Sequence, residues 1–496
     1  MGLLFSKPKP ARPATVPTDT IIPCHYWDAQ PIMRAYCMDL TFRFDDVLDT
    51  DKMRAALARL LEIGDWRKLG ARIRLNEAGK LEYHVPEKYD EKRPGFTFTI
   101  AKYDMSIKDH PLASRLPKMT DRPSLVGSTT EFSPLVRSAD APKKLEDWLY
   151  SDFPQLPIHV VSFNDATLLT VTFMHTLTDA MGMSSFFRAW TAVLRGEEDQ
   201  VPPFVGFNKD PMASLSEATP PERYVYFGKV MKGLSLAMFV VRIIFDLIWH
   251  PQEEERVIFV PAEYLQQMRD SALQELAAES NEGRTPFVSE GDVLYSWLSR
   301  VVLSALKPAA DRTVALLNVF DVRSTLEDRF PPNSAYIGNA VVSAFTFVPA
   351  RRILEAPLSF VASQLRAALE QQRTREQIQA YVAIHTRAVD KTGQVPLFGD
   401  AGMLLLSCTN WAKGRLFEID FSSAVIAPGL PLSQRANKLG RASYINVVPH
   451  KNRIPTRNSV SVVGKDAAGN FWTILSMRKE AWPKVDEYLR ALSEDK

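Results

Sequence analysis

The stretch most informative about the fold reads Thr167-Leu168-Leu169-Thr170-Val171-Thr172-Phe173-Met174, followed directly by His175-Thr176-Leu177-Thr178-Asp179. The first part is β-branched and apolar throughout, which predicts a buried strand. Residues 183–194 then predict an apolar helix. A histidine at the exposed end of a buried strand is well placed for proton transfer. Asp179 also fits the N-cap of the helix that follows.

Other strands and helices are predicted on both sides of the strand that ends at His175. Residues 158–163 are again β-branched and apolar, and Asn164-Asp165 separates them from the strand that precedes His175. Further predicted elements of the first half are a strand over residues 35–44, a helix over 53–61 behind an Asp49/Thr50 cap, a hairpin over 71–75 and 80–85, and a long surface loop over 105–142. The first half of the chain is therefore a mixture of helices and strands.

Five prolines between residues 201 and 221 predict a linker and a domain boundary, at positions 202, 203, 211, 220 and 221. Beyond it, the predicted helices cover residues 262–278, 290–306 and 358–377, and the predicted strands cover 313–319, 340–347, 403–408, 459–464 and 471–477. We expect a tail at 1–20, a first domain at 21–205 that carries His175, a crossover linker at 206–255 and a second domain at 256–496. Both domains are mixed α and β.

The composition excludes several classes of protein. Lysine and arginine number 60 against 58 aspartate and glutamate in 496 residues, so the chain has no overall field to hold a nucleic acid. The three cysteines, Cys24, Cys37 and Cys408, form neither a disulfide framework nor a cysteine-rich zinc site, and we expect no metal. No transmembrane span or secretory signal is predicted. These features favour a cytoplasmic protein, which we expect to be a monomer.

The N-terminus carries a separate signal. Met1-Gly2-Leu3-Leu4-Phe5-Ser6 fits the acceptor pattern for N-myristoylation at Gly2, and Lys7, Lys9 and Arg12 supply the basic cluster that a single acyl chain needs for membrane attachment. The alternative is that Gly2 is a chance residue of a proline-rich tail. The pattern predicts peripheral membrane contact through the N-terminus.

The apolar stretch from Leu234 to Trp249 follows the linker. A buried helix is the favoured interpretation, and the alternatives are a helix that lines an acceptor tunnel or one that touches a membrane. Arg242 and Asp246 are one helical turn apart, which predicts an ion pair between them.

Short motifs occur in a fixed order around His175-x-x-x-Asp179. They are Leu69-Gly70-Ala71-Arg72, the strand Val160 to Phe163, Ser289-Glu290-Gly291-Asp292 before Trp297, Asp321-Val322-Arg323, Pro331-Pro332 with Tyr336-Ile337-Gly338-Asn339, and Ser407 to Trp411 before Asp420-Phe421. This order resembles the BAHD family of acyl-CoA-dependent acyltransferases, in the branch that includes the fungal trichothecene-acetyltransferase-like enzymes. Two positions depart from the family pattern: Ala180 replaces the glycine after the motif aspartate, and the D-F-G-W-G motif survives only as Asp420-Phe421.

The resemblance implies an α/β fold of two similar mixed-sheet domains of the chloramphenicol-acetyltransferase type, with the active site in a channel between them. It implies an acyltransferase that moves an acyl group, most simply acetyl, from acyl-CoA to a hydroxyl or amine of a small secondary metabolite. Acyl-CoA is then a co-substrate, and no cofactor is bound permanently. The alternatives are a condensation-like or cyclising enzyme of the same fold that does not use CoA, and a non-catalytic small-molecule binding protein.

The resemblance also implies a role for individual residues. His175 is the general base, and Asp179 supports the site by pairing with Arg323. Thr409 and Trp411 are the candidate oxyanion donors, with packing on a central strand as the alternative.

The resemblance places Ser289 and Asp292 near the pantetheine arm of CoA, and they also fit a helix cap. Lys413, Lys438 and Arg441 are candidates for the CoA phosphates, among which the sequence does not choose.

Overall fold

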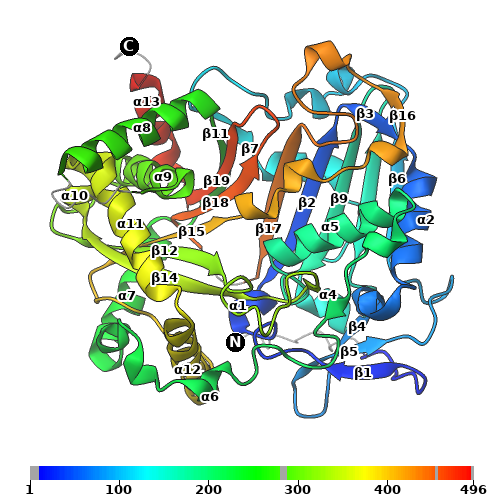
Figure 1. Ribbon diagram of the computed structural model, residues 1–496, viewed down its shortest axis with the longest axis horizontal. Coiled ribbons are helices and arrows are strands. Elements are labelled where there is room, and N and C mark those ends of the chain that lie inside the picture. Colours follow the sequence, from blue (N-terminus) through cyan, green and yellow to red (C-terminus); the bar gives the residue numbers. More distant parts are fainter. Residues whose placement is uncertain (1–10, 280–286, 453–455, 493–496) are drawn as a thin grey trace, which may run out of the picture.

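Two mixed β-sheets form the centre of the molecule in the computed structural model, which describes residues 11–279, 287–452 and 456–492 (Figure 1). The first has five strands in the order β17 (Tyr444–Lys451), β2 (Tyr36–Phe44), β9 (Thr167–Met174), β8 (Pro157–Ser162) and β6 (Thr97–Lys102). The central strand β9 is buried along its whole length. The apolar and β-branched side chains of β9 are therefore covered by other parts of the protein on both faces of the sheet.

The second sheet has seven strands. Their order is β14 (Val341–Pro349), β12 (Thr313–Asp321), β15 (Leu404–Asn410), β18 (Ser459–Lys465), β19 (Phe471–Arg478), β11 (Glu253–Val260) and β7 (Ser124–Ser128). β12, β15 and β18 run parallel to one another, whereas the other pairings in this sheet are antiparallel. Three small sheets complete the strands, namely β1 (Thr20–Pro23), β5 (Leu81–Val85) and β4 (Arg72–Leu75); β10 (Phe204–Val205) with β13 (Ala335–Tyr336); and β16 (Val425–Pro428) with β3 (Asp46–Leu48).

Each large sheet contains one strand from the other half of the chain. β7, from the first half, pairs with β11 at the edge of the seven-stranded sheet, and β17, from the second half, pairs with β2 in the five-stranded sheet. In Figure 1 the orange β17 lies beside the blue β2. The loop prediction for residues 105–142 is wrong, because β7 lies inside it and uses the edge of a distant sheet. The division of the chain at residues 205 and 256 stays a prediction, and the two exchanged strands cross it.

The helices cover the sheets from outside. They are α1 (Pro31–Arg34), α2 (Thr50–Leu60), α3 (Ser133–Val136), α4 (Leu145–Leu149), α5 (Ala180–Leu194), α6 (Leu215–Ala218), α7 (Gly233–Trp249), α8 (Ala262–Glu279), α9 (Glu290–Leu306), α10 (Ala350–Glu355), α11 (Leu358–Gln372), α12 (Arg375–Thr392) and α13 (Trp482–Ala491). The cap predicted for α2 is confirmed, since the Asp49 carboxylate accepts from the backbone of Asp51 and Lys52. The helix predicted over 358–377 is two helices, because the chain turns at Arg373 and Thr374 caps α12.

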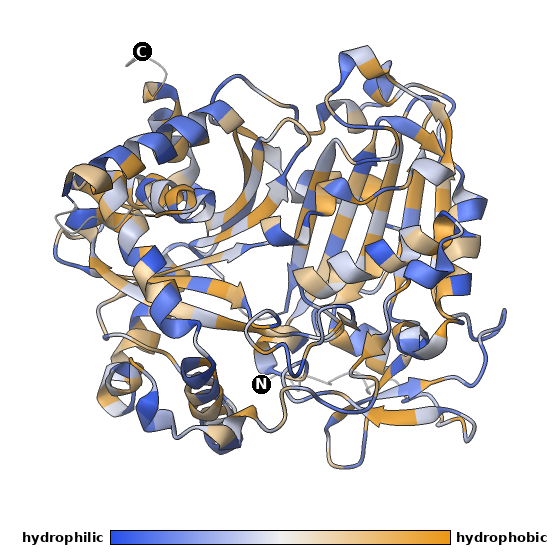
Figure 2. Ribbon diagram, viewed as in Figure 1, coloured by the Kyte–Doolittle hydropathy of each residue, from blue (hydrophilic) through white to orange (hydrophobic). Residues whose placement is uncertain are grey.

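The cores lie where helices meet sheets. One core joins α2 and α5 to the five-stranded sheet, and another joins α8, α9, α11 and α13 to one face of the seven-stranded sheet. Figure 2 shows apolar residues gathered along the sheet strands and hydrophilic residues along outer helices such as α2 and α8. Burial of these apolar side chains is the main force that holds the layers together.

The N-terminal tail is predicted to carry a myristoylation signal. Gly2, Lys7 and Lys9 of the myristoylation signal lie outside the described residues.

The prediction of a buried helix over residues 234–249 is confirmed for the helix and wrong for its burial, because α7 exists but Phe239 is its one buried residue. The predicted pair of Arg242 with Asp246 is replaced by one between Asp246 and Arg457, whose guanidinium reaches the helix from another segment. Among the described residues, no helix has the length and apolarity to cross a membrane.

Candidate active site

His175 stands at the end of β9, where the strand turns towards α5. Its backbone N–H donates to the Tyr36 carbonyl at 2.9 Å, and its own carbonyl accepts from the Asn339 side chain at 2.8 Å. The Tyr36 ring contacts the imidazole edge-on, with the ring centroids 6.5 Å apart. Residues from both halves of the chain therefore hold the main chain of His175.

The environment of His175 keeps its imidazole neutral. Burial lowers the pKa of His175, while its own carbonyl and the Asp179 carboxylate act in the opposite direction with less effect. A neutral imidazole has one nitrogen lone pair that accepts a proton. At pH 7 the side chain is thus in the form that a general base requires.

Asp179 is held by groups other than the imidazole. Arg323, just beyond β12, donates to both carboxylate oxygens, at 3.0 and 3.1 Å. The backbone N–H groups of Gly182 and Ala340 donate to the same carboxylate at 2.8 and 2.9 Å. Asp179 also caps α5. Because these four hydrogen bonds use both oxygens of the carboxylate, Asp179 links the two halves of the chain and does not act as a proton acceptor.

Arg323 is a shared centre of this network. It also donates to Asp321 at 2.6 Å and to the Gly338 carbonyl at 2.6 Å, and it lies over the Tyr336 ring. Because a guanidinium has five N–H donors in a fixed plane, one arginine can hold the turn after His175 and the segment around Gly338 together. The motif around Arg323 and the motif around His175 therefore form one structural unit.

Gly182 explains how Ala180 is tolerated after the motif aspartate. A Cβ atom on Gly182 would lie 2.1 Å from the Ile337 carbonyl oxygen and 2.4 Å from the Thr178 hydroxyl. The backbone of α5 thus approaches the second half of the chain at this position. The glycine that the close approach demands is at 182 rather than at 180.

Thr409 and Trp411 lie where β15 ends. The Trp411 indole N–H donates to the Thr409 hydroxyl at 3.0 Å, and the Trp411 backbone N–H donates to Val462. The turn that follows reaches α5, because the Gly414 carbonyl accepts from the Ser184 hydroxyl at 2.5 Å. Since an indole has one donor, the Thr409 hydroxyl proton is the donor that this pair leaves available.

Ser289 and Asp292 form a capping box at the start of α9. The Ser289 hydroxyl donates to Asp292 at 2.7 Å, and Arg366 donates to the same carboxylate at 2.9 Å. A Cβ atom on Gly291 would lie 2.9 Å from the Asn410 side chain. The first turn of α9 therefore lies against the end of β15, next to Thr409.

Asp28 and Asn339 are site residues that the sequence predictions did not single out for a role. Asn339 uses its two amide protons on the His175 carbonyl and on Asp28, each at 2.8 Å. Asp28 is buried, which raises its pKa to about 7, and bonds from Asn339 oppose that rise. Nothing in the pattern around Asp28 distinguishes it from a turn residue, whereas Asn339 was visible only as part of a motif.

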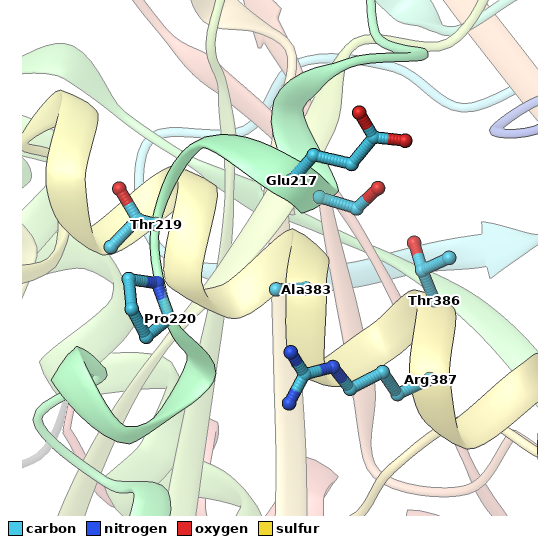
Figure 3. Close-up of a pocket in the computed structure, with 7 residues that line it drawn as sticks. Glu217, Thr219, Pro220, Ala383, Thr386 and Arg387 are labelled. Atoms are coloured by element: carbon cyan, nitrogen blue, oxygen red, sulfur yellow. The ribbon is translucent and has the colours of Figure 1, made fainter.

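Of two cavities in the described part of the chain, the larger lies away from these residues and the smaller touches Asp28. A cavity of about 360 Å³ lies between α6 and α12, and Figure 3 shows Glu217, Thr219 and Arg387 around it. A much smaller one, of about 10 Å³, touches Asp28 and Gly338 behind the His175 turn. We therefore identify the site by the hydrogen bonds among its residues rather than by a cavity.

The order of motifs and the contacts between them agree with the comparison to known proteins. The family model described as the Transferase family matches residues 31–435. The chain belongs to the BAHD acyltransferase family. It is an acyltransferase of the kind that transfers groups other than aminoacyl. Its relatives include the acetyltransferase sphE of Aspergillus fumigatus, 47% identical over 100% of this chain and 99% of the relative. Another is the acetyltransferase adrJ of Penicillium rubens, 45% identical over 99% of both chains.

Among solved structures, the chain is similar to TRI101 of F. sporotrichioides in complex with coenzyme A and T-2. The TM-score is 0.66 at 16% identity, with 95% of this chain and 98% of that chain covered. This likeness shows the fold, in which two mixed-sheet units of the chloramphenicol-acetyltransferase type are combined. The predicted family and fold class are confirmed.

Proposed function

We propose that this BAHD acyltransferase transfers an acetyl group from acetyl-CoA to a hydroxyl or amine of a small secondary metabolite, with His175 as general base. The observation that carries the proposal is the position of His175, whose main chain is held at the end of β9 by bonds to Tyr36 and Asn339 and whose pKa is lowered by burial. Relatives at 45–47% identity that are named acetyltransferases support acetyl as the acyl group. A structural neighbour in complex with coenzyme A supports the choice of donor.

The reaction needs one proton acceptor. The acceptor hydroxyl or amine attacks the thioester carbonyl while His175 takes its proton, and the imidazolium then returns that proton to the departing CoA thiolate. No covalent enzyme intermediate is required, because the thioester carbonyl is already activated and the thiolate leaves readily. The products are the acylated metabolite and free CoA thiol.

The tetrahedral intermediate carries a negative oxygen that needs a donor. We assign this role to the Thr409 hydroxyl, with Trp411 as the residue that orients it through the indole N–H. Of the two predicted oxyanion residues, Thr409 is thus the donor, and Trp411 holds it in position. Asp179 and Arg323 keep the His175 turn in place and do not touch the substrate.

The CoA arm is proposed to run past the first turn of α9. Ser289 and Asp292 are bonded to each other and to Arg366, so their contribution is the position of that turn rather than a free side-chain donor. For the phosphates we favour Lys413 over Lys438 and Arg441, because Lys413 lies two residues beyond Trp411 and, unlike Arg441, is exposed.

The test is thiol release from acetyl-CoA with a panel of alcohols and amines. We expect His175→Ala to lower the rate by about 10²- to 10⁴-fold, and Thr409→Val to lower it by a smaller factor. His159→Gln is the matched control, since His159 is bonded to Thr99 on β6 and has no place in the mechanism. Equal thiol release by wild type and His175→Ala would falsify the base assignment.

The rival functions are distinguished in the same assay. A condensation-like or cyclising enzyme would consume its substrate without release of CoA thiol. A non-catalytic binding protein would bind small molecules, measured by calorimetry, and release no thiol with any acceptor.

A further inference from the structure

The helix α7 has an apolar side that faces solvent. Leu234, Met238, Val241, Phe245, Ile248 and Trp249 recur at helical spacing and form what we name the outer stripe. All six are exposed, with Leu234 76%, Ile248 70% and Trp249 68% accessible. Figure 1 shows α7 at the periphery of the molecule. Monomeric soluble proteins rarely expose so continuous an apolar surface.

The opposite side of α7 is anchored to the protein. Phe239 is buried with Ala315 of β12 and Met403, and Leu236 packs against the same group. At the end of the helix, Arg457 pairs with Asp246 at 2.5 Å. The helix is therefore fixed on the face of the seven-stranded sheet, and the outer stripe points outwards from a rigid support.

The exposed charges at the start and in the middle of the helix are cationic. Lys229 and Lys232 precede α7 and are exposed, and Arg242 is exposed on it. Asp246 is the one acidic residue of the helix, and Arg457 neutralises it. At the C-terminal end, Glu253 also pairs with Arg457 and Glu480 lies 3.6 Å from His250. Within the described part of the chain, the cations without an ion pair beside the outer stripe are thus Lys229, Lys232 and Arg242, which complement an anionic surface.

We propose that the outer stripe inserts into the surface of a lipid bilayer that carries anionic headgroups, with α7 lying in the plane of the membrane. The stripe offers side chains without hydrogen-bonding groups except the Trp249 indole, whereas a protein interface combines an apolar core with a polar rim and several hydrogen bonds. Phe245 and Trp249 stack at 5.1 Å, and tryptophan favours the boundary between headgroups and acyl chains. With 17 residues, α7 is too short to cross the bilayer.

A second copy of the chain fits the stripe less well. α7 is about 26 Å long at 1.5 Å per residue, and the stripe consists of six residues, whereas a stable dimer uses about 20–30 residues on each side. Two stripes in parallel contact would also bring Lys229, Lys232 and Arg242 of each copy together, and an antiparallel contact would still bring the two Arg242 side chains close. A bilayer has neither restriction, since it covers a narrow stripe and attracts the cations.

The first experiment measures flotation of the full chain, made in bacteria so that Gly2 carries no myristoyl group. The vesicles are phosphatidylcholine alone or phosphatidylcholine with phosphatidylserine. We expect flotation with the anionic vesicles and at least a tenfold lower partition coefficient for Phe245→Glu/Ile248→Glu. The matched control is Ile426→Glu/Leu432→Glu, which alters two side chains that are 66% and 57% exposed away from α7. Lys229→Gln/Lys232→Gln should weaken the preference for phosphatidylserine.

A second measurement follows Trp249 directly. The other tryptophans of the chain are buried or partly buried, so a blue shift of emission with vesicles and quenching by brominated lipid should be lost in Trp249→Phe. Wild-type protein that stays with the lipid-free fraction overturns the proposal. So does a dimer, seen by sedimentation without lipid, that Phe245→Glu/Ile248→Glu dissociates. Thermal melts of each variant show that it is folded.

Discussion

α5 and α7 are two apolar helices of similar length in opposite environments. α5 buries eleven of its fifteen residues, whereas α7 buries one of its seventeen. In α5, the Trp190 indole donates to the Met53 carbonyl and Phe187 packs against Phe42. In α7, Trp249 is exposed. An apolar helical pattern therefore predicts a helix but not the surface that the helix faces.

The buried helix α5 and the exposed helix α7 also differ in their connection to the candidate active site. The start of α5 is bonded to the second half of the chain through Asp179 and Ser184, so a change there reaches the site of His175. The outer stripe of α7 has no such bonds. Substitutions in the two helices should consequently give effects that differ in both size and kind.

The largest effect is expected where α5 begins. Asp179→Ala removes the cap of α5 and one of the two carboxylates that pair with the buried Arg323, so that only Asp321 remains. This should lower the free energy of unfolding by up to about 3–5 kcal/mol, because the buried guanidinium is then only partly compensated. Urea denaturation measures this change. Asp49→Ala, at the exposed cap of α2, is the control and should cost about 1 kcal/mol. If both variants lose the same amount, the pair with Arg323 contributes nothing beyond the cap.

A second effect concerns pH. Because burial lowers the pKa of His175, the rate of thiol release should be level near pH 7 and fall tenfold per unit only below a midpoint lower than about 6.5. The folded state then binds fewer protons than the unfolded chain between that midpoint and pH 6.5. Stability should decline as pH falls through this window, by at most about 1.4 kcal/mol per unit.

The variant His175→Gln separates the two consequences. It should remove the contribution of His175 to the slope of stability against pH, since glutamine does not titrate. A rate profile of the wild type with its acidic midpoint above pH 6.5 would contradict a base whose charged form is disfavoured by burial.

Much of the fold was predictable because its strands are strongly patterned. β9 and β12 combine apolar and β-branched residues, β15 begins with three leucines, and these short apolar runs predict the three strands directly. β7 and β17 were not predicted, since each pairs with a strand far away in the sequence and nothing local shows the partner. Strand exchange is decided by tertiary contacts rather than by local propensity.

The site was predictable only as far as its motifs. His175 and Asp179 stand in one turn whose pattern is readable, and Arg323 came from the resemblance. Asp28 was not found, because its importance is a contact with Asn339 across 311 positions. Likewise, the bond from Trp411 to Thr409, which decides which of them has a free donor, depends on a side-chain conformation that spacing does not reveal.

The smallest effect is expected in the outer stripe. Phe245→Ser/Ile248→Ser should change the free energy of unfolding in lipid-free buffer by no more than about 0.5 kcal/mol, as for other surface substitutions. Phe187→Ala in α5, which empties a packed position, should cost about 3–5 kcal/mol in the same urea series. The reason is that Phe245 and Ile248 are already in water in the folded state, so unfolding exposes little further apolar area. A large loss of stability in the α7 variant would mean that the stripe is covered in lipid-free solution, and the contrast between the two helices would then disappear.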